Sequence, residues 1–254
     1  MDKIEKKEDK DEDEEGIKIT SSFDKKNVIT FGNTELDKKI GGGIPASSLS
    51  LVDGPNASGK SVLTQQIMWG AAQQGFTIAS YTTENTIKSL LKQMDSLSFD
   101  ITDYFVFGKL KIHPIRIKGT EWAEDVPFLK YIVNDLKRKQ EEIVVIDSLS
   151  IFVSHSSETD ILDFFTACKG LCDSGKSILV TLHDYVFTEE MMTRLKSICD
   201  AHIRLRIEEV GDRLVKTMEV AKIRGAKRTT GNIIGFEVEP GFGLRIIPIS
   251  RAKV

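Results

Sequence analysis

The segment GPNASGKS, from Gly54 to Ser61, follows a short apolar run and constrains this chain more than any other part of it. Glycines at both ends allow the backbone to curl so that successive N–H groups point at phosphate oxygens. A helix that begins near Lys60 would add the positive end of its dipole. The spacing is that of a phosphate-binding loop between a strand and a helix. A glycine-rich turn without a ligand is the alternative, and so many fixed identities in so short a segment argue against it.

Each position of this loop has an expected role at a nucleoside triphosphate. The Lys60 ammonium should reach the β- and γ-phosphates, and the Ser61 hydroxyl should complete the coordination of Mg²⁺. We expect the nucleotide to be held by Gly54, Pro55, Asn56, Ala57, Ser58, Gly59, Lys60, Ser61 and Val62. These residues contain no motif that recognises a particular base.

Charge is distributed unevenly along the 254 residues, whose formal net charge is −3. Residues 1–16 contain nine acidic residues and four lysines, a net of −5, which leaves +2 for the rest of the chain. A segment with so few apolar side chains cannot form a core, so we expect a disordered acidic tail over residues 1–16 and a single domain over residues 17–254. The nearly neutral body shows no electrostatic signature of nucleic-acid binding.

No apolar run in the sequence is long enough to span a bilayer, and the N-terminus is charged where a secretion signal would be apolar. We therefore expect a cytoplasmic protein that does not insert into a membrane.

Helical and strand patterns alternate after the phosphate loop. The expected helices cover residues 62–71, 87–97, 126–140 and 161–171, and the expected strands cover residues 76–83, 110–112, 143–147 and 177–183. This alternation predicts an α/β fold in which a mainly parallel sheet is flanked by helices on both faces. The last third differs, because runs of alternating polarity surround Gly211 and Pro240-Gly241. That pattern predicts antiparallel β hairpins at the C-terminal end.

Polar side chains end several of the expected strands. Asp147 follows an apolar run, which is the position of the acid that holds Mg²⁺ in phosphate-loop proteins, although an ordinary strand-end aspartate looks the same. Glu84 could accept the proton of a water that attacks the γ-phosphate, or be a solvated acid at a helix N-terminus. His183 and Asp184 could sense the γ-phosphate, and a structural role suits His183 equally well. Because ligands lie at the carboxyl ends of parallel strands, we expect these side chains and Gly54 to share one crevice.

Two cations, Lys222 and Arg224, are two residues apart in an expected strand and should point to the same side of it. Together they could reach a nucleotide bound by a neighbouring subunit, as a finger supplied in trans. A basic edge strand that resists aggregation would show the same pattern. The sequence leaves both interpretations open.

Three segments together resemble the KaiC-like branch of RecA-fold ATPases. They are GNTELDKKIGGGIP before the phosphate loop, KIRGAKR in the last third, and GFGLRIIPI near the end. The resemblance implies a RecA-like P-loop NTPase core that binds ATP and Mg²⁺. It also implies that Ser61 and Asp147 hold the metal, that Glu84 is the base, and that Lys222 and Arg224 act in trans.

Within this branch, the single domain, the GPNASGKS loop and the acidic tail are most similar to the ATP-binding component of the archaeal flagellum (archaellum) motor. That resemblance implies a homo-hexameric ring with nucleotide between subunits, peripheral to the cytoplasmic face of the membrane. Its implied partners are the archaellum assembly ATPase and membrane-anchored motor proteins.

One position departs from the family pattern, because Asn85 follows Glu84 where two consecutive glutamates are common. An amide can orient a water but cannot accept its proton. Our hypothesis is that ATP assembles and regulates the ring, with weak or absent hydrolysis. Two alternatives remain: an active KaiC-like ATPase or autokinase, and a RecA/RadA-like DNA recombination protein. Against the second stands the loop after Asp147, which contains no lysine or arginine.

Overall fold

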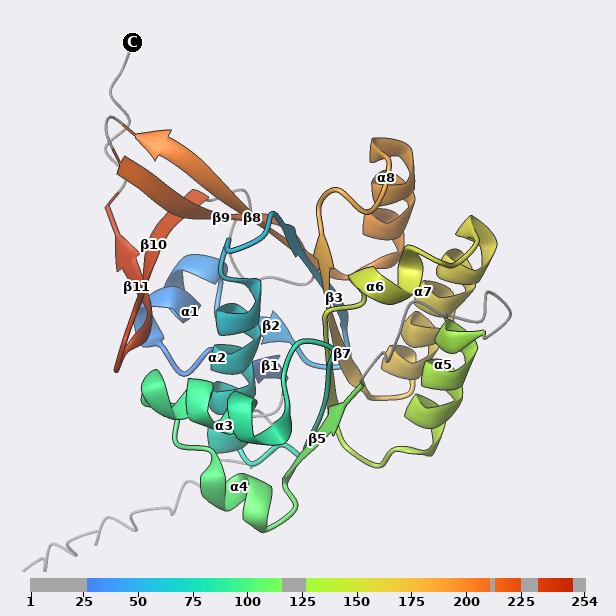
Figure 1. The fold of residues 1–254 in the computed structure, drawn as a ribbon, viewed down its shortest axis with the longest axis horizontal. Coiled ribbons are helices and arrows are strands. Elements are labelled where there is room, and N and C mark those ends of the chain that lie inside the picture. Colours follow the sequence, from blue (N-terminus) through green and yellow to red (C-terminus); the bar gives the residue numbers. More distant parts are fainter. Residues whose placement is uncertain (1–26, 116–126, 211–212, 225–232, 249–254) are drawn as a thin grey trace, which may run out of the picture.

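A nine-stranded sheet runs through the described part of the chain (Figure 1). The structure is a computed structural model, and it describes residues 27–115, 127–210, 213–224 and 233–248. The strand order across the sheet is β11-β10-β9-β8-β3-β7-β6-β4-β5. Strands β3 (Leu49–Gly54), β4 (Ile78–Thr82), β5 (Leu110–Pro114), β6 (Ile143–Asp147), β7 (Ser177–His183) and β8 (Ala201–Val210) are parallel to their neighbours among this set.

The C-terminal strands complete the sheet in the antiparallel sense. Strands β9 (Arg213–Ile223), β10 (Ile233–Glu239) and β11 (Gly243–Ile247) each pair antiparallel with the strand before them. A separate two-stranded sheet joins β1 (Val28–Ile29) to β2 (Ile44–Pro45). The predicted fold class, a RecA-like core with C-terminal antiparallel hairpins, is confirmed.

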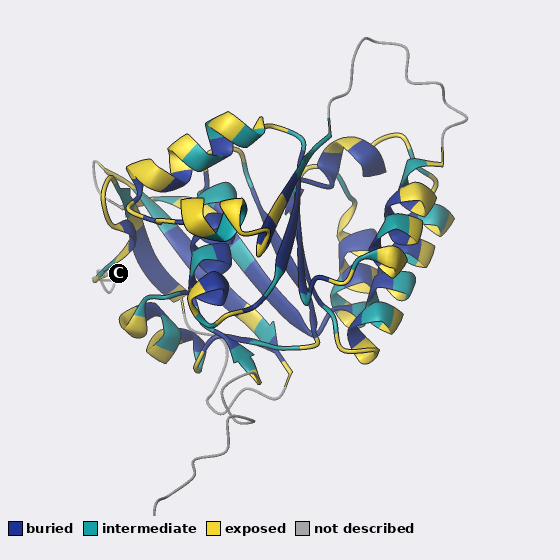
Figure 2. Ribbon diagram, turned by 90° about the horizontal axis from the view of Figure 1, so that it is seen from below, coloured by how far each residue is buried: buried dark blue, intermediate teal, exposed yellow. Residues whose placement is uncertain are grey.

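Helices cover both faces of the sheet and enclose two apolar cores (Figures 1 and 2). One face carries α1 (Thr34–Ile40), α2 (Lys60–Gln73), α3 (Ile87–Ser96) and α4 (Thr102–Val106), and the other carries α5 (Phe128–Arg138), α6 (Ser150–Val153), α7 (Glu158–Asp173) and α8 (Glu189–Ile198). Successive strand residues point to opposite faces, so Val52 packs in the core under α2 while Leu51 packs in the core under α7. Strands buried on both faces explain the continuous apolar runs in the sequence.

Some elements were not expected from the sequence patterns, namely helices α1, α4, α6 and α8. Helix α1 begins where the Asn33 side chain accepts hydrogen bonds from two backbone N–H groups, and it ends at Gly41, whose φ is 95°. Helix α8 is capped by Thr188, whose side chain accepts a hydrogen bond from one backbone N–H group, and its buried apolar stripe is confined to Met191, Met192 and Leu195. A stripe this short is difficult to separate from a loop by periodicity alone.

The predicted acidic tail, residues 1–16, lies outside the described residues, and so does the predicted turn at Gly211. The division of the chain into this tail and one domain over residues 17–254 therefore stays a prediction. Among the described helices, none has both the length and the apolar character that a membrane span requires.

Candidate functional site

The phosphate-loop segment connects the end of β3 to the start of α2, as predicted. Gly59 forms the N-terminal boundary of α2 with φ 101°, a conformation that side chains rarely adopt. Gly54 is required for a different reason, because a Cβ atom there would lie 2.5 Å from the carbonyl oxygen of Leu205. The two glycines of the motif are thus needed for the turn and for the close approach of β8.

Lys60 lies in the concave side of this loop. Its Nζ donates hydrogen bonds to the carbonyl oxygens of Gly54 at 2.9 Å and Pro55 at 2.7 Å. Burial lowers the pKa of Lys60, while the carboxylates of Asp147, Asp184, Glu84 and Asp53 act in the opposite direction. The ammonium is therefore held among loop carbonyls at the point where several carboxylates converge.

Asp147 lies at the end of β6, which is separated from β3 by β7, and its charge acts on the loop lysine, Lys60. The hydroxyl of Thr181 on β7 donates to Asp147 Oδ1 at 2.7 Å, and the hydroxyl of Thr64 on α2 lies 3.5 Å from Oδ2. The carboxylate is thus fixed between a strand and the helix that begins with Lys60. The sequence analysis missed Thr181 and Thr64, although a threonine within the apolar run of β7 signals a buried polar contact.

Glu84 follows β4 and is exposed at its C-terminal end. Its pKa is raised by partial burial and then by the charge of Asp147. The neighbouring Asn85 is engaged in the first turn of α3, where its side-chain oxygen accepts a hydrogen bond from the Ser89 hydroxyl at 3.0 Å. Glu84 therefore lies in the field of Asp147 and Lys60, whereas the Asn85 side chain is engaged in the first turn of α3.

His183 lies beside the phosphate loop, because it is the register partner of Gly54 across β3 and β7. Its Nδ1 and its backbone N each lie 2.9 Å from the hydroxyl of Ser150 on α6. Burial and the charge of Lys60 lower its pKa. The backbone N–H of the adjacent Asp184 donates to the Gly54 carbonyl oxygen at 3.3 Å. The structure brings the ends of these strands together around Lys60, whereas a crevice shared by all of these side chains and γ-phosphate sensing by His183 and Asp184 stay predictions.

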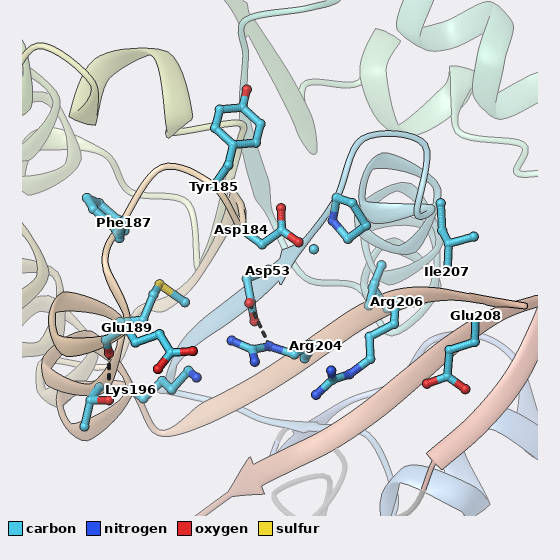
Figure 3. A pocket seen from close by; sticks show the side chains of 15 residues that line it. Asp53, Asp184, Tyr185, Phe187, Glu189, Lys196, Arg204, Arg206, Ile207 and Glu208 are labelled. Carbon is cyan, nitrogen blue, oxygen red and sulfur yellow. Dashed lines mark hydrogen bonds and ion pairs between the residues drawn. The ribbon is translucent and has the colours of Figure 1, made fainter.

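A buried network next to the loop was not predicted. Asp53, the residue before Gly54, has no exposed surface, and its two carboxylate oxygens contact His202 Nε2 and Arg204 Nε on β8. Burial alone would raise the pKa of Asp53, but these two partners outweigh it and hold the pKa below its usual value. Figure 3 shows Asp53 and Arg204 beside a cleft of about 780 Å³ that borders Gly54 and Pro55.

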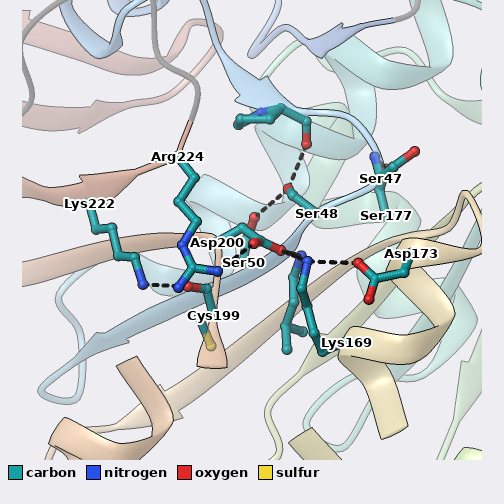
Figure 4. A network of polar contacts seen from close by, with 12 residues as sticks. Ser47, Ser48, Ser50, Lys169, Asp173, Ser177, Cys199, Asp200, Lys222 and Arg224 are labelled. Carbon is teal, nitrogen blue, oxygen red and sulfur yellow. Dashed lines mark hydrogen bonds and ion pairs between the residues drawn. The ribbon is translucent and has the colours of Figure 1, made fainter. Parts of the chain in front are cut away.

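Lys222 and Arg224 lie at the opposite end of β3 from the phosphate loop (Figure 4). Lys222 Nζ donates to the carbonyl oxygens of Lys196 at 2.8 Å and Cys199 at 2.7 Å, at the C-terminal end of α8. Arg224 donates to Asp200 Oδ1 at 3.2 Å and to the Ser197 carbonyl oxygen at 2.9 Å. Both cations are thus attached to the same helix end, and a contact in trans stays a prediction.

The residues around the loop fit a phosphate chain with a metal ion. The Ser58 hydroxyl is buried within the loop and has no hydrogen-bond partner among the described residues, so it is free to contact a phosphate oxygen. Ser61, Thr64 and Asp147 supply the oxygen ligands that Mg²⁺ prefers. A strand–loop–helix of this sequence at the carboxyl end of a central strand in a mainly parallel sheet, with an acid ending a nearby strand, defines a P-loop NTPase of the RecA type.

Comparison with known proteins agrees with this class. The model of a family described as “ATPase: KaiC” matches residues 29–251, and the chain belongs to the KaiC family of ATPases. It is 35% identical over 231 residues to the Archaeal flagellar ATP-binding protein FlaH of Sulfolobus acidocaldarius, covering 89% of this chain and 99% of that protein. The predicted resemblance to KaiC-like ATPases, and among them to the archaellum component, is confirmed.

Solved structures give the same result. The crystal structure of the flagellar accessory protein FlaH from Methanocaldococcus jannaschii is 26% identical with a TM-score of 0.78, covering 88% of this chain and 99% of that one. A KaiC-like protein from Pyrococcus horikoshii is 21% identical with a TM-score of 0.70, covering 87% and 99%, and shows the shared fold alone.

Proposed function

We propose that this chain binds Mg-ATP as a component of an archaellum motor complex, and that ATP acts mainly by assembling a homo-hexameric ring. The similarity to proteins named FlaH supports the archaellum assignment. In this proposal Ser61 and Asp147 hold Mg²⁺, and the loop from Gly54 to Val62 holds the nucleotide. The partners are the archaellum assembly ATPase and membrane-anchored motor proteins, which would keep the protein at the cytoplasmic face of the membrane.

The observation that carries the ring proposal is that the phosphate loop and the two cations, Lys222 and Arg224, lie far apart within one subunit. The phosphate loop follows the carboxyl end of β3, whereas Arg224 is joined through Asp200 to Leu49 at the amino end of the same strand. Sites at opposite ends of a subunit cannot meet within one chain. They can meet between chains in a head-to-tail ring, where one subunit supplies the loop and the next supplies Lys222 and Arg224.

Slow hydrolysis is supported by the surroundings of Asn85. Its side-chain oxygen accepts a hydrogen bond from Ser89, and an amide cannot take a proton from water in any case. A specific observation favours the alternative of an active ATPase, because the raised pKa of Glu84 makes its carboxylate a stronger base. The two functions differ in the rate of phosphate release.

The test measures molar mass in solution and phosphate release in the same samples, with and without Mg-ATP. We expect the native chain to assemble only with Mg-ATP and to release phosphate near background. Lys60→Ala should not assemble, because it lacks the cation that faces the phosphates. Lys92→Ala removes an exposed lysine from α3 and serves as the matched control.

Rapid phosphate release that disappears in Glu84→Gln would identify an active ATPase with Glu84 as the base. A native chain whose molar mass does not respond to Mg-ATP would contradict the ring proposal.

A further inference from the structure

A second group of cations surrounds a cavity that the phosphate loop does not border. This cavity of about 250 Å³ is lined by Lys196, His202, Arg204, Glu219, Ala221 and Lys222. It lies between the last turn of α8 and strands β8 and β9. Lys196 and Arg204 also line the larger cleft, and Figure 3 shows both side chains directed into it.

The Lys196 ammonium has no hydrogen bond or ion pair with any described residue, although its side chain is half-buried. Burial and then the neighbouring Arg204 lower its pKa, against the weaker influence of Asp53 and Glu219. A cation that is partly desolvated beside another cation gains from an anion that approaches both.

The other two cations also have donors to spare. Arg204 uses Nε for Asp53, and the donors of its terminal nitrogens bond no described residue. Lys222 uses two donors for the helix-end carbonyls, and its third donor bonds no residue in the described part of the chain. These bonds hold both side chains in place before any ligand arrives, so an incoming anion meets a prearranged set of donors.

Glu219, the carboxylate that lines this cavity, is already paired, and so are the nearby Asp53 and Asp200. Glu219 accepts from Arg206 Nη2 at 2.7 Å, and Asp53 is held by His202 and Arg204. Asp200, which faces the same helix end, is paired with Lys169 and Arg224. The unpaired charge that lines the cavity is therefore positive.

We propose that Lys196, Arg204 and Lys222 form a phosphate-binding pocket distinct from the phosphate loop of the same chain. The phosphate groups belong to a nucleotide held on the loop of a second copy of this chain. This inference rests on the proposed function and deepens it, because it adds Lys196 and Arg204 to the cations that one subunit presents to the next.

The proposal is tested with Lys196→Ala and a matched control, Arg194→Ala. Arg194 lies on the same helix and is half-exposed, but it pairs with Glu190 and Glu158 and lines neither cavity. Lys196→Ala should raise the protein concentration needed for Mg-ATP-dependent assembly by about tenfold, the effect of losing one charged hydrogen bond, and Arg194→Ala should not. Lys196→Gln, which keeps the apolar stem, should behave like Lys196→Ala if charge is what matters. Equal assembly of Lys196→Ala and the native chain would overturn the proposal.

Two further arms distinguish the source of the phosphate. Inorganic pyrophosphate titrated into Lys60→Ala tests the pocket in a chain whose own loop is disabled, and we expect binding that weakens about tenfold when Lys196→Ala is added. A mixture of Lys60→Ala and Lys196→Ala tests the second copy. Each variant retains the half that the other lacks, so with Mg-ATP the mixture should form dimers at protein concentrations at which neither variant assembles alone.

These experiments test phosphate binding by the pocket and assembly of the ring independently of each other. Pyrophosphate binding that depends on Lys196, together with a mixture that stays monomeric, would overturn the second copy as the source. A native chain that never assembles would contradict the proposed function, and the pyrophosphate titration would still decide whether the pocket binds phosphate. Thermal melting of each variant reports whether it is folded.

Discussion

The carboxylate of Asp53 accepts a hydrogen bond from Arg204 Nε at 2.9 Å, and this contact ties the residue before the phosphate loop to strand β8. Asp53 is fully buried, and His202 contacts its other oxygen. The same arginine lines the cavity at which we place the phosphate of a second copy. Asp53 therefore links the phosphate loop, which is one half of the proposed intersubunit site, to Arg204, which belongs to the other half.

Replacing Asp53 should be costly, because Arg204 and His202 would lose their shared partner. We expect Asp53→Ala to lower the free energy of unfolding by about 3–5 kcal/mol, as for other broken buried ion pairs. Urea denaturation measures this. Glu239→Ala is the control, because its pair with Arg245 is about half-exposed and should contribute less than about 1 kcal/mol. Equal losses in the two variants would contradict the role of burial.

Thr181→Val should weaken the response to Mg²⁺ with little change in shape. The variant removes the hydroxyl that orients Asp147 Oδ1 and keeps the volume of the side chain. We expect about a tenfold higher Mg²⁺ concentration for half-maximal nucleotide binding, as when other groups that orient a metal ligand are lost. Titration of Mg²⁺ against a fluorescent ATP analogue measures it. Thr193→Val removes an exposed hydroxyl whose one hydrogen bond to a described residue is with the Glu189 carbonyl oxygen, and it should leave the midpoint unchanged.

Gly54→Ala should abolish nucleotide binding, because the added Cβ would meet the Leu205 carbonyl oxygen and displace the start of the loop. Gly170→Ala is the matched control. A Cβ at that helical position meets nothing within 4 Å, so this variant should bind nucleotide normally and gain about 0.5–1 kcal/mol of stability. Calorimetric binding together with thermal melting distinguishes the two. Normal binding by Gly54→Ala would show that β8 can move away.

Asp200→Asn should change the pH dependence of stability. Burial would raise the pKa of Asp200, but the Leu49 N–H, Lys169 and Arg224 outweigh it and lower the pKa. A carboxyl with a lowered folded-state pKa stabilises the fold at pH values above its unfolded value of about 3.9, and this stability is lost as the pH falls through the folded value.

The expected result is a melting temperature well below that of the native chain at pH 7, with a difference that shrinks below about pH 4. Melting curves between pH 3 and pH 8, with the exposed Asp100→Asn as control, measure it. A difference that is independent of pH would show that the carboxylate charge is unimportant.

The parts of the site that were predicted depend on local sequence. The loop around Lys60 needs only a strand, two glycines and a helix start within a few residues, and Asp147 needs only to end an apolar run. The groups that orient them could not be predicted. Thr181 is 34 residues from Asp147, and Arg204 is 151 residues from Asp53, so their contacts depend on which strands become neighbours.

Lys222 and Arg224 likewise combine a feature that could be predicted from the sequence with one that could not. Their spacing in a strand was readable, but the helix end to which both are bound belongs to α8, whose short apolar stripe gave no clear signal. The chain by itself therefore determined the phosphate loop, the alternation of strands and helices, and the family, because these depend on residues close together along the backbone. The tertiary structure alone decided the buried partners of Asp53 and Asp200 and the second group of cations, because strand order brings together side chains that are distant in sequence.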